Sequence, residues 1–501
     1  MTSVNSVVAM ITDLNMQKVF IMFISFLAAA SMVAAQQVAG TAQTLAAASM
    51  VAAQQVAGTA QTFAAASMVA DTAQTVDAEP KMTLKDCMAY AISNSTKVRI
   101  QQAANGDARI DRRDAILMAF TPQITSQTYA YYNFGRSIDP QTNTYFNTTS
   151  FYNGYQVQAG FDLFNGFQAV SNIKISKTAL QMGVTQEKQV EADICLSVME
   201  AYYNVVYFTK LQRLFEEQVQ TAKSSLKLAK RQEELGQKGH ADVVQMEADL
   251  ADREYDLVNN RSQLNTQLLN LRDLMYWPLD SVLNIETDIE DAGNSLPSGD
   301  VNSVADYALS NNPGVQIAGW KLLNAERALN TAKWQLMPKL SLYAGWDTRY
   351  YSYKGSSTDP FHSQFKNNAG EYVQLSLTLP IFNRLSKYSA IARKKHAVAT
   401  ASAEYDQKRH DVDAEVRKAF QDSDDALAAW QQASRKEEVQ DEAYRLNSRK
   451  LEQGLISPIE YRTATDNYLK AKADKYNSLY KYLIKQSVVR YYGGEEYINQ
   501  F

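Results

Sequence analysis

The sequence predicts a mainly α-helical protein with a transmembrane β part, in which one strand–strand–long-helix unit occurs twice. The first observation is a constant offset, because Phe164 and Phe382, like Gly236 and Gly454, differ by 218 positions. Since this offset holds across strand, helix and helix break, it indicates a duplicated unit. The other observations are four segments of alternating apolar and polar residues, and two helical runs of about 70 residues each.

The alternating segments predict four strands. Apolar residues share one face of each strand, and polar residues share the other. The polar face carries Gln156, Gln158 and Asp162 in the second strand and Gln374, Ser376 and Thr378 in the fourth. The predicted strands are Ile124–Phe134, Tyr155–Leu163, Leu340–Tyr350 and Tyr372–Asn383, and the apolar face of the second carries Tyr155, Val157, Ala159, Phe161 and Leu163.

Alternation by itself fits a half-buried sheet of a soluble protein as well as a membrane sheet. The length favours the membrane, because a tilted strand crosses a bilayer in about 10 residues. Many of the 29 tyrosines flank these strands, as an interfacial aromatic girdle requires. Four strands cannot close a barrel, and open edges in lipid leave backbone groups unpaired. The strands therefore predict a barrel shared by at least two chains in a cyclic oligomer.

The N-terminal 81 residues have the composition of an export signal followed by a low-complexity segment. Residues 1–35 predict a signal peptide, with Lys18 before the apolar run 19–30 and Met16 as the alternative start. Residues 36–81 are rich in Ala, Gln and Thr and contain an 18-residue tandem repeat, so we expect them to be disordered. We interpret the repeat as replication slippage. After the signal, no run of about 18 apolar residues predicts a transmembrane helix.

The remaining chain divides into two repeats and a linker. Residues 82–277 form the first repeat, 278–300 an acidic linker with a short strand at Val282–Ile285, 301–492 the second repeat, and 493–501 a tail. The expected short helices are Leu84–Ser93 (capped by Thr83), Lys97–Phe120, Ser303–Ser310 and Gly314–Met337 after Pro313; the long ones are Asn165–Leu235, Val243–Leu271, Lys387–Leu451 and Pro458–Val489. Apolar spacings of three, four and seven predict that the long helices pack along their lengths. Long loops are expected at 135–154 and 351–371.

Composition argues against several classes of function. The net charge of −4 over 501 residues does not favour a nucleic-acid binder. The two cysteines, Cys87 and Cys195, are far apart in predicted helices and are interpreted as buried free thiols. The four histidines lack metal-ligand spacing, and no phosphate-binding loop or catalytic triad is present. We therefore expect no enzyme activity, metal or cofactor, and a passive function.

These features together resemble the TolC family of outer-membrane efflux proteins. The resemblance rests on the duplicated plan, on Leu163-Phe-Asn165 and Leu379-Pro-Ile-Phe-Asn383 at strand-to-helix turns, and on Glu452-Gln-Gly454 followed by Ser457-Pro-Ile-Glu460 at a helix break. It covers about residues 82–495. It implies a homotrimer with a 12-stranded β-barrel continued by a 12-helix periplasmic α-helical barrel, anchored in outer-membrane lipid. It also implies two partners, a periplasmic membrane-fusion adaptor and an inner-membrane pump of the RND or ABC type.

The two helix breaks are the candidate functional site under this resemblance. Gly236, Gly239, Gly454 and Ser457 are the candidate tip turns for adaptor docking, because a helix reversal often needs a residue at positive φ. Arg231 and Arg449 stand at equivalent places and suit docking or a gating ion pair, although a cation is also favourable at any helix C-terminus. Asp242 and Glu460 are candidate entrance acids, or simply acids of a first helical turn. Gln156, Gln158, Asp162, Gln374, Ser376 and Thr378 are the candidate barrel lumen.

The sequence thus predicts an outer-membrane exit duct of a tripartite efflux system, extending into the periplasm. It would conduct small toxic compounds passively and be gated at the helical tips by adaptor and transporter docking. Two alternatives stay open: an exit duct for type I protein secretion, and a non-conducting coiled-coil scaffold of the envelope. A scaffold has no use for four alternating strands flanked by aromatic residues.

Overall fold

The structure is a computed structural model that describes residues 81–138, 143–237, 239–287, 300–354, 358–453 and 455–501. The predicted signal peptide, nearly all of the tandem-repeat segment, Gly454 and most of the linker lie outside these residues. The described chain divides into two compact units. One contains Asp111–Lys174 and Asn330–Ile391; the other contains the segment ending at Ile110, Ile175–Leu329 and Ala392–Phe501. Each unit therefore draws on both repeats.

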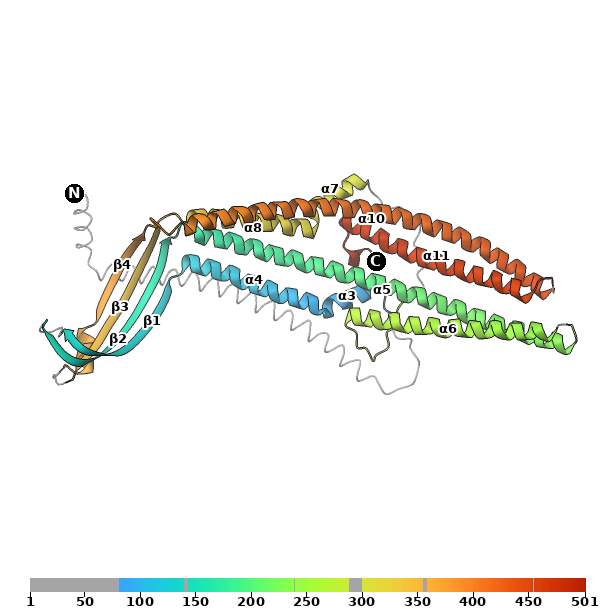
Figure 1. The fold of residues 1–501 in the computed structure, drawn as a ribbon, viewed down its shortest axis with the longest axis horizontal. Coiled ribbons are helices and arrows are strands. Elements are labelled where there is room, and N and C mark those ends of the chain that lie inside the picture. Colours follow the sequence, from blue (N-terminus) through green and yellow to red (C-terminus); the bar gives the residue numbers. More distant parts are fainter. Residues whose placement is uncertain (1–80, 139–142, 238, 288–299, 355–357, 454) are drawn as a thin grey trace, which may run out of the picture. The chain divides into compact units, whose positions relative to one another are not determined.

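The first unit is built on a four-stranded antiparallel sheet in the order β1-β2-β3-β4 (Figure 1). The strands are β1 (Gln123–Ile138), β2 (Tyr145–Phe164), β3 (Lys339–Tyr353) and β4 (Gly370–Thr378). Each strand pairs with the next strand along the chain, so all four predicted strands exist, and each hairpin comes from one repeat.

Their lengths differ from the sequence prediction. β2 begins ten residues before Tyr155, because tyrosine and phenylalanine favour strands and Tyr152 stacks on Tyr131 of β1 at 5.1 Å between ring centroids. β4 ends at Thr378 and not at Asn383, since Pro380 cannot donate a ladder hydrogen bond. A β-bulge between Asp162 and Phe164 shifts the register of β2 against β3 and leaves Leu163 without a directly paired residue in β3.

The expected loop at 351–371 also differs, because it contains the helix α9 (Phe361–Asn367). The expected loop at 135–154 is mostly strand in its described part. Here pairing between the two strands overrode the loop composition of Asn, Thr and Ser.

The second unit is helical. It contains α3 (Leu84–Asn94), α6 (His240–Met275), α7 (Val301–Asn311) and α11 (Pro458–Tyr492), and ends in a 3-10 turn, η1 (Tyr497–Asn499). Four further helices have residues in both units: α4 (Thr96–Phe120), α5 (Gln168–Glu234), α8 (Pro313–Trp334) and α10 (Ser386–Glu452). In Figure 1, α5 with α6 and α10 with α11 each form an antiparallel pair joined by a tight turn. No helix in the described part of the chain is long and apolar enough to cross a membrane.

Local signals account for most helix ends. Thr83 caps α3 as predicted, and its hydroxyl accepts from the Asp86 N–H while Asp86 accepts from Thr83 N–H, a capping box. α8 ends three residues before the predicted Met337. The residue before Pro338 avoids the helical region, and residues 335–337 form a turn instead.

The core of the second unit lies where α3, α5, α6, α11 and η1 meet. Val198, Val205 and Leu271, which belong to the predicted apolar seams, are at most 1% exposed. Tyr203 of α5 stacks on Tyr480 of α11 with 5.5 Å between ring centroids, and the packing therefore joins the two repeats. Burying large apolar and aromatic side chains in this way is the main stabilising contribution.

The described end of the linker and the tail both join this core. Instead of the predicted strand at Val282–Ile285, only a single parallel bridge forms between Met82 and Ile285. In the tail, Tyr497 is buried and stacks on Tyr491 at 4.6 Å between ring centroids. The tail is therefore a packed part of the second unit.

Candidate functional site

The strand register places the predicted lumen residues on one face of the sheet. Gln158 of β2 pairs with Gly345 of β3, which pairs with Tyr372 of β4; Asp162, Ser341 and Ser376 align in the same way. Because directly paired residues of neighbouring strands point to the same face, this polar face is continuous across β2, β3 and β4. The predicted lumen residues on it are Gln156, Gln158, Asp162, Gln374, Ser376 and Thr378.

Side-chain contacts tie this polar face together. The Gln156 amide donates to Gln158 Oε1 at 3.4 Å and to the Tyr372 hydroxyl at 3.2 Å. Asp162 forms an ion pair with Lys339 Nζ at 3.0 Å and accepts a hydrogen bond from the Ser341 hydroxyl at 2.7 Å. Polar groups held in this way suit a face that meets water.

The opposite face is apolar and largely uncovered. Val373, Leu375 and Leu377 of β4 belong to it and are 45%, 62% and 62% exposed. Ile124 of β1 is 63% exposed on the same face. A continuous exposed apolar band of this kind marks a surface for a partner or a lipid phase.

The two helix turns, here called the tips, end their first helices in the same way. Gln237 N–H donates to Gln232 O after α5, and Leu455 N–H donates to Lys450 O after α10, both at 2.8 Å. This bond is typical of a helix end that turns through a left-handed residue. Gly236 has a φ of +66°, as the sequence predicts for this reversal, whereas Gly454 lies outside the described residues.

The second helices of the two tips begin differently. Ser457 caps α11 with a capping box, because its hydroxyl accepts from Glu460 N–H and the Glu460 carboxylate accepts from Ser457 N–H. Gly239 caps α6 at a φ of −81° with no side-chain hydrogen bond, so it needs no left-handed conformation. The positive φ expected of the tip glycines thus holds at Gly236 and not at Gly239.

The four predicted charged residues of the tips lie apart and interact, where they do, with residues of their own helix or its cap. Arg231 is 69% exposed and pairs with Glu234 of its own helix at 2.7 Å. Arg449 is exposed in the last turn of α10, and no ion pair within the described chain involves it. Asp242 lies in the first turn of α6, and Glu460 is held by the capping box. The structure therefore does not bring these four residues together.

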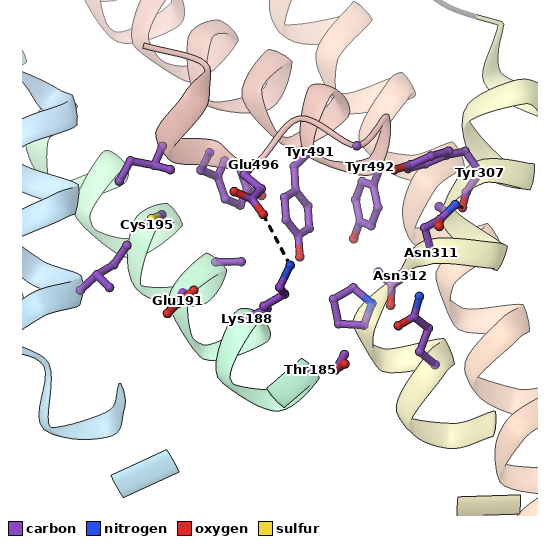
Figure 2. A pocket seen from close by; sticks show the side chains of 18 residues that line it. Thr185, Lys188, Glu191, Cys195, Tyr307, Asn311, Asn312, Tyr491, Tyr492 and Glu496 are labelled. Atoms are coloured by element: carbon purple, nitrogen blue, oxygen red, sulfur yellow. Dashed lines mark hydrogen bonds and ion pairs between the residues drawn. The ribbon is translucent and has the colours of Figure 1, made fainter. Parts of the chain in front are cut away.

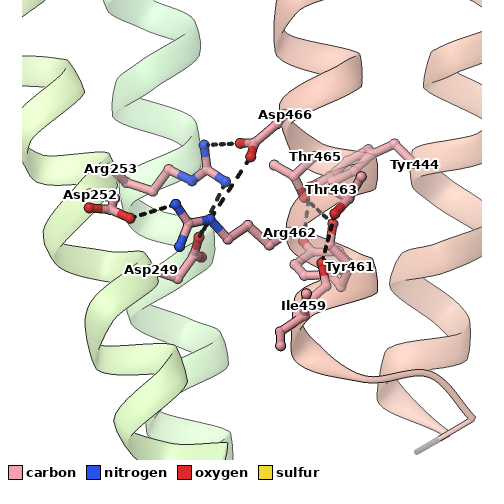
Figure 3. Close-up of polar contacts among 10 residues, drawn as sticks. All are labelled: Asp249, Asp252, Arg253, Tyr444, Ile459, Tyr461, Arg462, Thr463, Thr465 and Asp466. Carbon is pink, nitrogen blue, oxygen red and sulfur yellow. Dashed lines mark hydrogen bonds and ion pairs between the residues drawn. The ribbon is translucent and has the colours of Figure 1, made fainter.

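A charge network farther along the helices does join α6 to α11 (Figure 3). Arg253 of α6 lies 2.7 Å from Asp466 of α11, and Arg462 of α11 lies 2.7 Å from Asp252 of α6. Asp249 of α6 lies 3.2 Å from Arg253 Nη2 and 3.9 Å from Arg462 Nε. We call these five residues the α6–α11 charge network; two arginines face three aspartates.

The two residues at the centre of this network, Arg253 and Asp249, are buried, which strengthens the interaction between their charges. The Arg253 side chain is 5% exposed and that of Asp249 is 13% exposed, whereas Asp252 and Asp466 are about half exposed. Burial by itself would lower the pKa of the Arg253 guanidinium, but Asp466 and Asp249 outweigh burial and raise the pKa. Arg253 is therefore charged at every physiological pH.

The sequence prediction missed this network because it treated the carboxylates of α6 as a solvated helix surface. One signal was present: Asp249 and Arg253 are four residues apart and share a helix face. Sequence spacing gives no indication that α11 supplies the second pair of charges.

The comparisons with known proteins agree with this geometry. A family model described as outer membrane efflux protein matches residues 92–275 and 304–494, one segment within each repeat. The chain belongs to the outer membrane efflux protein family. Proteins of this family are channels of the outer membrane, so this is an outer-membrane channel protein and not an enzyme.

Solved structures show the same fold for this efflux protein. The Campylobacter jejuni outer-membrane channel CmeC matches with a TM-score of 0.69 at 16% identity, over 82% of this chain and 86% of that chain. VceC of Vibrio cholerae matches with a TM-score of 0.66 at 16% identity, over 82% of this chain and 96% of VceC. CusC matches with a TM-score of 0.65 at 15% identity, over 84% of this chain and 96% of CusC. No curated protein sequence matches the chain.

The efflux protein also has a cavity of about 370 Å³ in its helical unit (Figure 2). Tyr307, Tyr491 and Tyr492 line it, and a Lys188–Glu496 ion pair of 3.9 Å lies at its side. Burial, followed by Glu187 and Glu496, raises the pKa of Glu191.

The cysteines are buried free thiols, as predicted. Burial raises the pKa of Cys87 to about 12, with Asp86 as the second cause, and burial raises that of Cys195 to about 12 as well. Both thiols stay protonated at neutral pH, so they are unreactive packing residues. In the described chain, no three His, Cys, Asp or Glu side chains gather to hold a metal ion.

Proposed function

We propose that three copies of this chain share one 12-stranded barrel, and that their helices continue it into the periplasm as a tunnel. The observation that carries the proposal is the four-stranded sheet, with one continuous polar face, one exposed apolar face, and β1 and β4 as unpaired edges. In lipid such edges must be paired, and pairing β4 with β1 of the next chain closes a barrel. The polar face then lines the water-filled pore.

The proposed role is the exit duct of a tripartite efflux system that passes small toxic compounds. The family assignment supports an efflux channel, and the periplasmic adaptor and the inner-membrane pump are partners inferred from the family resemblance. The tip turns, with Gly236, Gly239, Gly454 and Ser457, are the proposed docking points for the adaptor. Arg231 and Arg449 project from equivalent places of the two tips and would contact the same partner.

The proposed gate is the α6–α11 charge network. It links a helix of the first repeat to a helix of the second, near the tips where both helices begin. If the entrance opens by moving one helix pair away from the other, the three ion pairs between α6 and α11 have to separate. Asp242 and Glu460 remain the proposed entrance acids in the same region.

Single-channel conductance in a planar bilayer tests both proposals. The variant Arg462→Ala/Asp466→Ala removes all three cross-helix ion pairs and leaves Arg253 paired with Asp249 on its own helix. Arg445→Ala is the matched control, because within the described residues Arg445 forms an ion pair only with Asp441, one turn away on α10. We expect small, mostly closed openings in wild type and in the control, and larger, longer openings in the double variant.

Other outcomes are equally informative. A folded, membrane-inserted oligomer without conductance would contradict the duct and favour the envelope scaffold. Equal conductance of wild type and double variant would keep the duct and remove the charge network from the gate. The variant Arg231→Ala/Arg449→Ala would then test whether the tip arginines hold the entrance closed.

A further inference from the structure

The β3–β4 hairpin stops short, and the helix α9 takes the place of the missing strand. β4 begins at Gly370 opposite Asp347, whereas β3 continues to Tyr353. The last six residues of β3 therefore lack a partner strand on the side of β4. The first hairpin has no such gap, since β1 and β2 pair up to Ile138 and Tyr145.

Side chains of α9 and the residue that follows it satisfy this open edge. Gln364 Nε2 donates to Tyr351 O at 2.9 Å, and Tyr351 N–H donates to Gln364 Oε1 at 3.1 Å. Asn368 Nδ2 donates to Arg349 O at 2.8 Å. Gln364 is 4% exposed, so its amide replaces the ladder bonds of a strand in a buried place. Such replacement is needed wherever a sheet edge meets lipid.

Aromatic contacts place α9 on the apolar side of the sheet. The Phe365 ring lies 5.4 Å from the ring of Tyr155 and 5.7 Å from that of Trp346, and the Phe361 ring lies 5.4 Å from that of Tyr350. By register, Tyr155, Trp346 and Tyr350 share the face that carries Val157 and Leu375, opposite the polar face. α9 therefore lies on the outer side of the proposed barrel and not in its lumen.

The outer surface of α9 combines an aromatic ring with basic side chains. Phe361 is 45% exposed, and His362 and Lys366 are exposed beside it. On the same face of β1, Tyr132 and Phe134 are 63% and 76% exposed. Aromatic rings next to cationic groups are typical of segments at the boundary between acyl chains and phosphate headgroups.

We propose that α9 is an interfacial helix that lies in the headgroup boundary of the lipid leaflet around the β3–β4 hairpin. Phe361, with Tyr132 and Phe134, enters the upper acyl region, and Lys366 meets lipid phosphate. This inference rests on the proposed membrane barrel. It assigns the second hairpin a headgroup contact through a helix, whereas the described residues of the first hairpin contain no helix.

Depth-dependent fluorescence quenching tests the inference. His362→Cys, Leu375→Cys and Gln374→Cys are labelled with a small environment-sensitive dye in the full chain; wild type, whose two thiols are buried, is the blank. Each is reconstituted in phosphatidylcholine–phosphatidylglycerol vesicles carrying a nitroxide at the headgroup or in mid-chain. We expect the headgroup nitroxide to quench most of the signal at position 362 and the mid-chain nitroxide to quench most of that at 375. Only aqueous iodide should quench the label at 374.

The control positions separate the two proposals. If the mid-chain nitroxide quenches the label at 375 while only iodide quenches the label at 362, the proposal of an interfacial helix is overturned and the proposal of a membrane barrel is supported. If neither nitroxide reaches the label at 375, the membrane barrel fails and the inference fails with it. A label at 362 quenched equally from mid-chain would place α9 too deep and overturn the headgroup contact.

Discussion

The two repeats have nearly the same skeleton and use it differently. α5 and α10 are both 67 residues long, α6 and α11 have 36 and 35 residues, and α3 and α7 both have 11. Yet β2 has 20 residues and β4 has nine, and among the described residues of the two hairpins only the second contains a helix. Helix length is therefore preserved while the strands and their connections have diverged.

The charges of the α6–α11 network are a second divergence. At the offset of 218 residues, Asp249, Asp252 and Arg253 of the first repeat correspond to Asn467, Lys470 and Ala471 of the second, and Arg462 and Asp466 correspond to Val244 and Ala248. Neither repeat could form this network with a copy of itself. The duplicated helices have become complementary partners, which binds the two halves of one chain to each other.

The largest expected loss of stability comes from replacing Arg253 by alanine, the residue that stands at the equivalent position 471 of the second repeat. Arg253→Ala leaves Asp249 and Asp466 without their buried partner, and losing one side of a buried ion pair costs about 3–5 kcal/mol. Hydrogen exchange of α6 and α11 and thermal unfolding of the purified protein in detergent measure the loss.

The double variant Asp249→Asn/Arg253→Ala is the control for this prediction, because Asn467 and Ala471 already occur together in the second repeat. It also removes the buried Asp249 carboxylate that Arg253→Ala alone leaves without its partner, so its loss of stability should be smaller than that of Arg253→Ala. An equal loss in both variants would show that Arg253 acts by packing and not by charge.

The strand-to-helix turns give a second contrast. Gly166 and Phe167 have φ values of +64° and +60°, and the equivalent Arg384 and Leu385 have +44° and +59°. A Cβ at Gly166 would lie 2.5 Å from the Trp334 carbonyl oxygen. We therefore expect Gly166→Ala to destabilise the first unit by about 2–3 kcal/mol through strain.

Arg384→Gly at the equivalent turn should stabilise the protein instead. The substitution removes the cost of a left-handed residue other than glycine, roughly 1–2 kcal/mol, but glycine loses about 0.5–1 kcal/mol more chain entropy on folding. A gain of about 0.5–1 kcal/mol is expected in thermal unfolding. A loss for Arg384→Gly comparable to that of Gly166→Ala would mean that the arginine side chain itself holds the second turn.

The tip caps give a smaller contrast. Ser457→Ala removes a capping box and should destabilise the start of α11 by about 1 kcal/mol. Gly239→Ser supplies a hydroxyl three residues before Asp242 and should stabilise α6 by a few tenths of a kcal/mol. Hydrogen exchange of the first turns of α6 and α11 measures both changes. If Gly239→Ser leaves the exchange of α6 unchanged, Asp242 is not free to complete a capping box.

The smallest expected effect is at Glu191 of α5, whose counterpart in α10 is Arg409. Because the folded-state pKa of Glu191 is raised, its contribution to stability is fully present below the unfolded pKa and is lost as pH rises through the folded pKa. Glu191→Gln should therefore raise the unfolding temperature slightly at pH 7 and lose this advantage as the pH falls toward 4. Glu200→Gln, at an exposed position of the same helix, is the control, and an equal rise there would remove the pH argument.

Much of the fold was open to prediction from sequence. Alternation gave the polar and apolar faces of the sheet, because side-chain direction in a strand follows from period two alone. Thr83 marked the start of a helix and Gly236 a tip turn, since capping and positive φ act within a few residues. The errors at β2 and β4 concern where pairing stops, which depends on the neighbouring strand.

The candidate site was predicted in part. The predicted lumen residues share one face of the sheet, as their alternation required, but the tip arginines do not meet the tip acids in the described chain. Arg253 and Asp466 meet across 213 positions of sequence, and Gln364 binds the backbone of Tyr351 beside a strand that ended early.

By itself, then, the sequence determined the kinds of elements, their duplication, the two faces of the sheet and the family, because these follow from local periodicity and residue order. Only the tertiary structure decided which charges of α6 face α11 and that α9 closes the open edge of β3. Those contacts depend on how whole helices and strands dock, and docking is decided by packing and desolvation between residues that no local pattern connects.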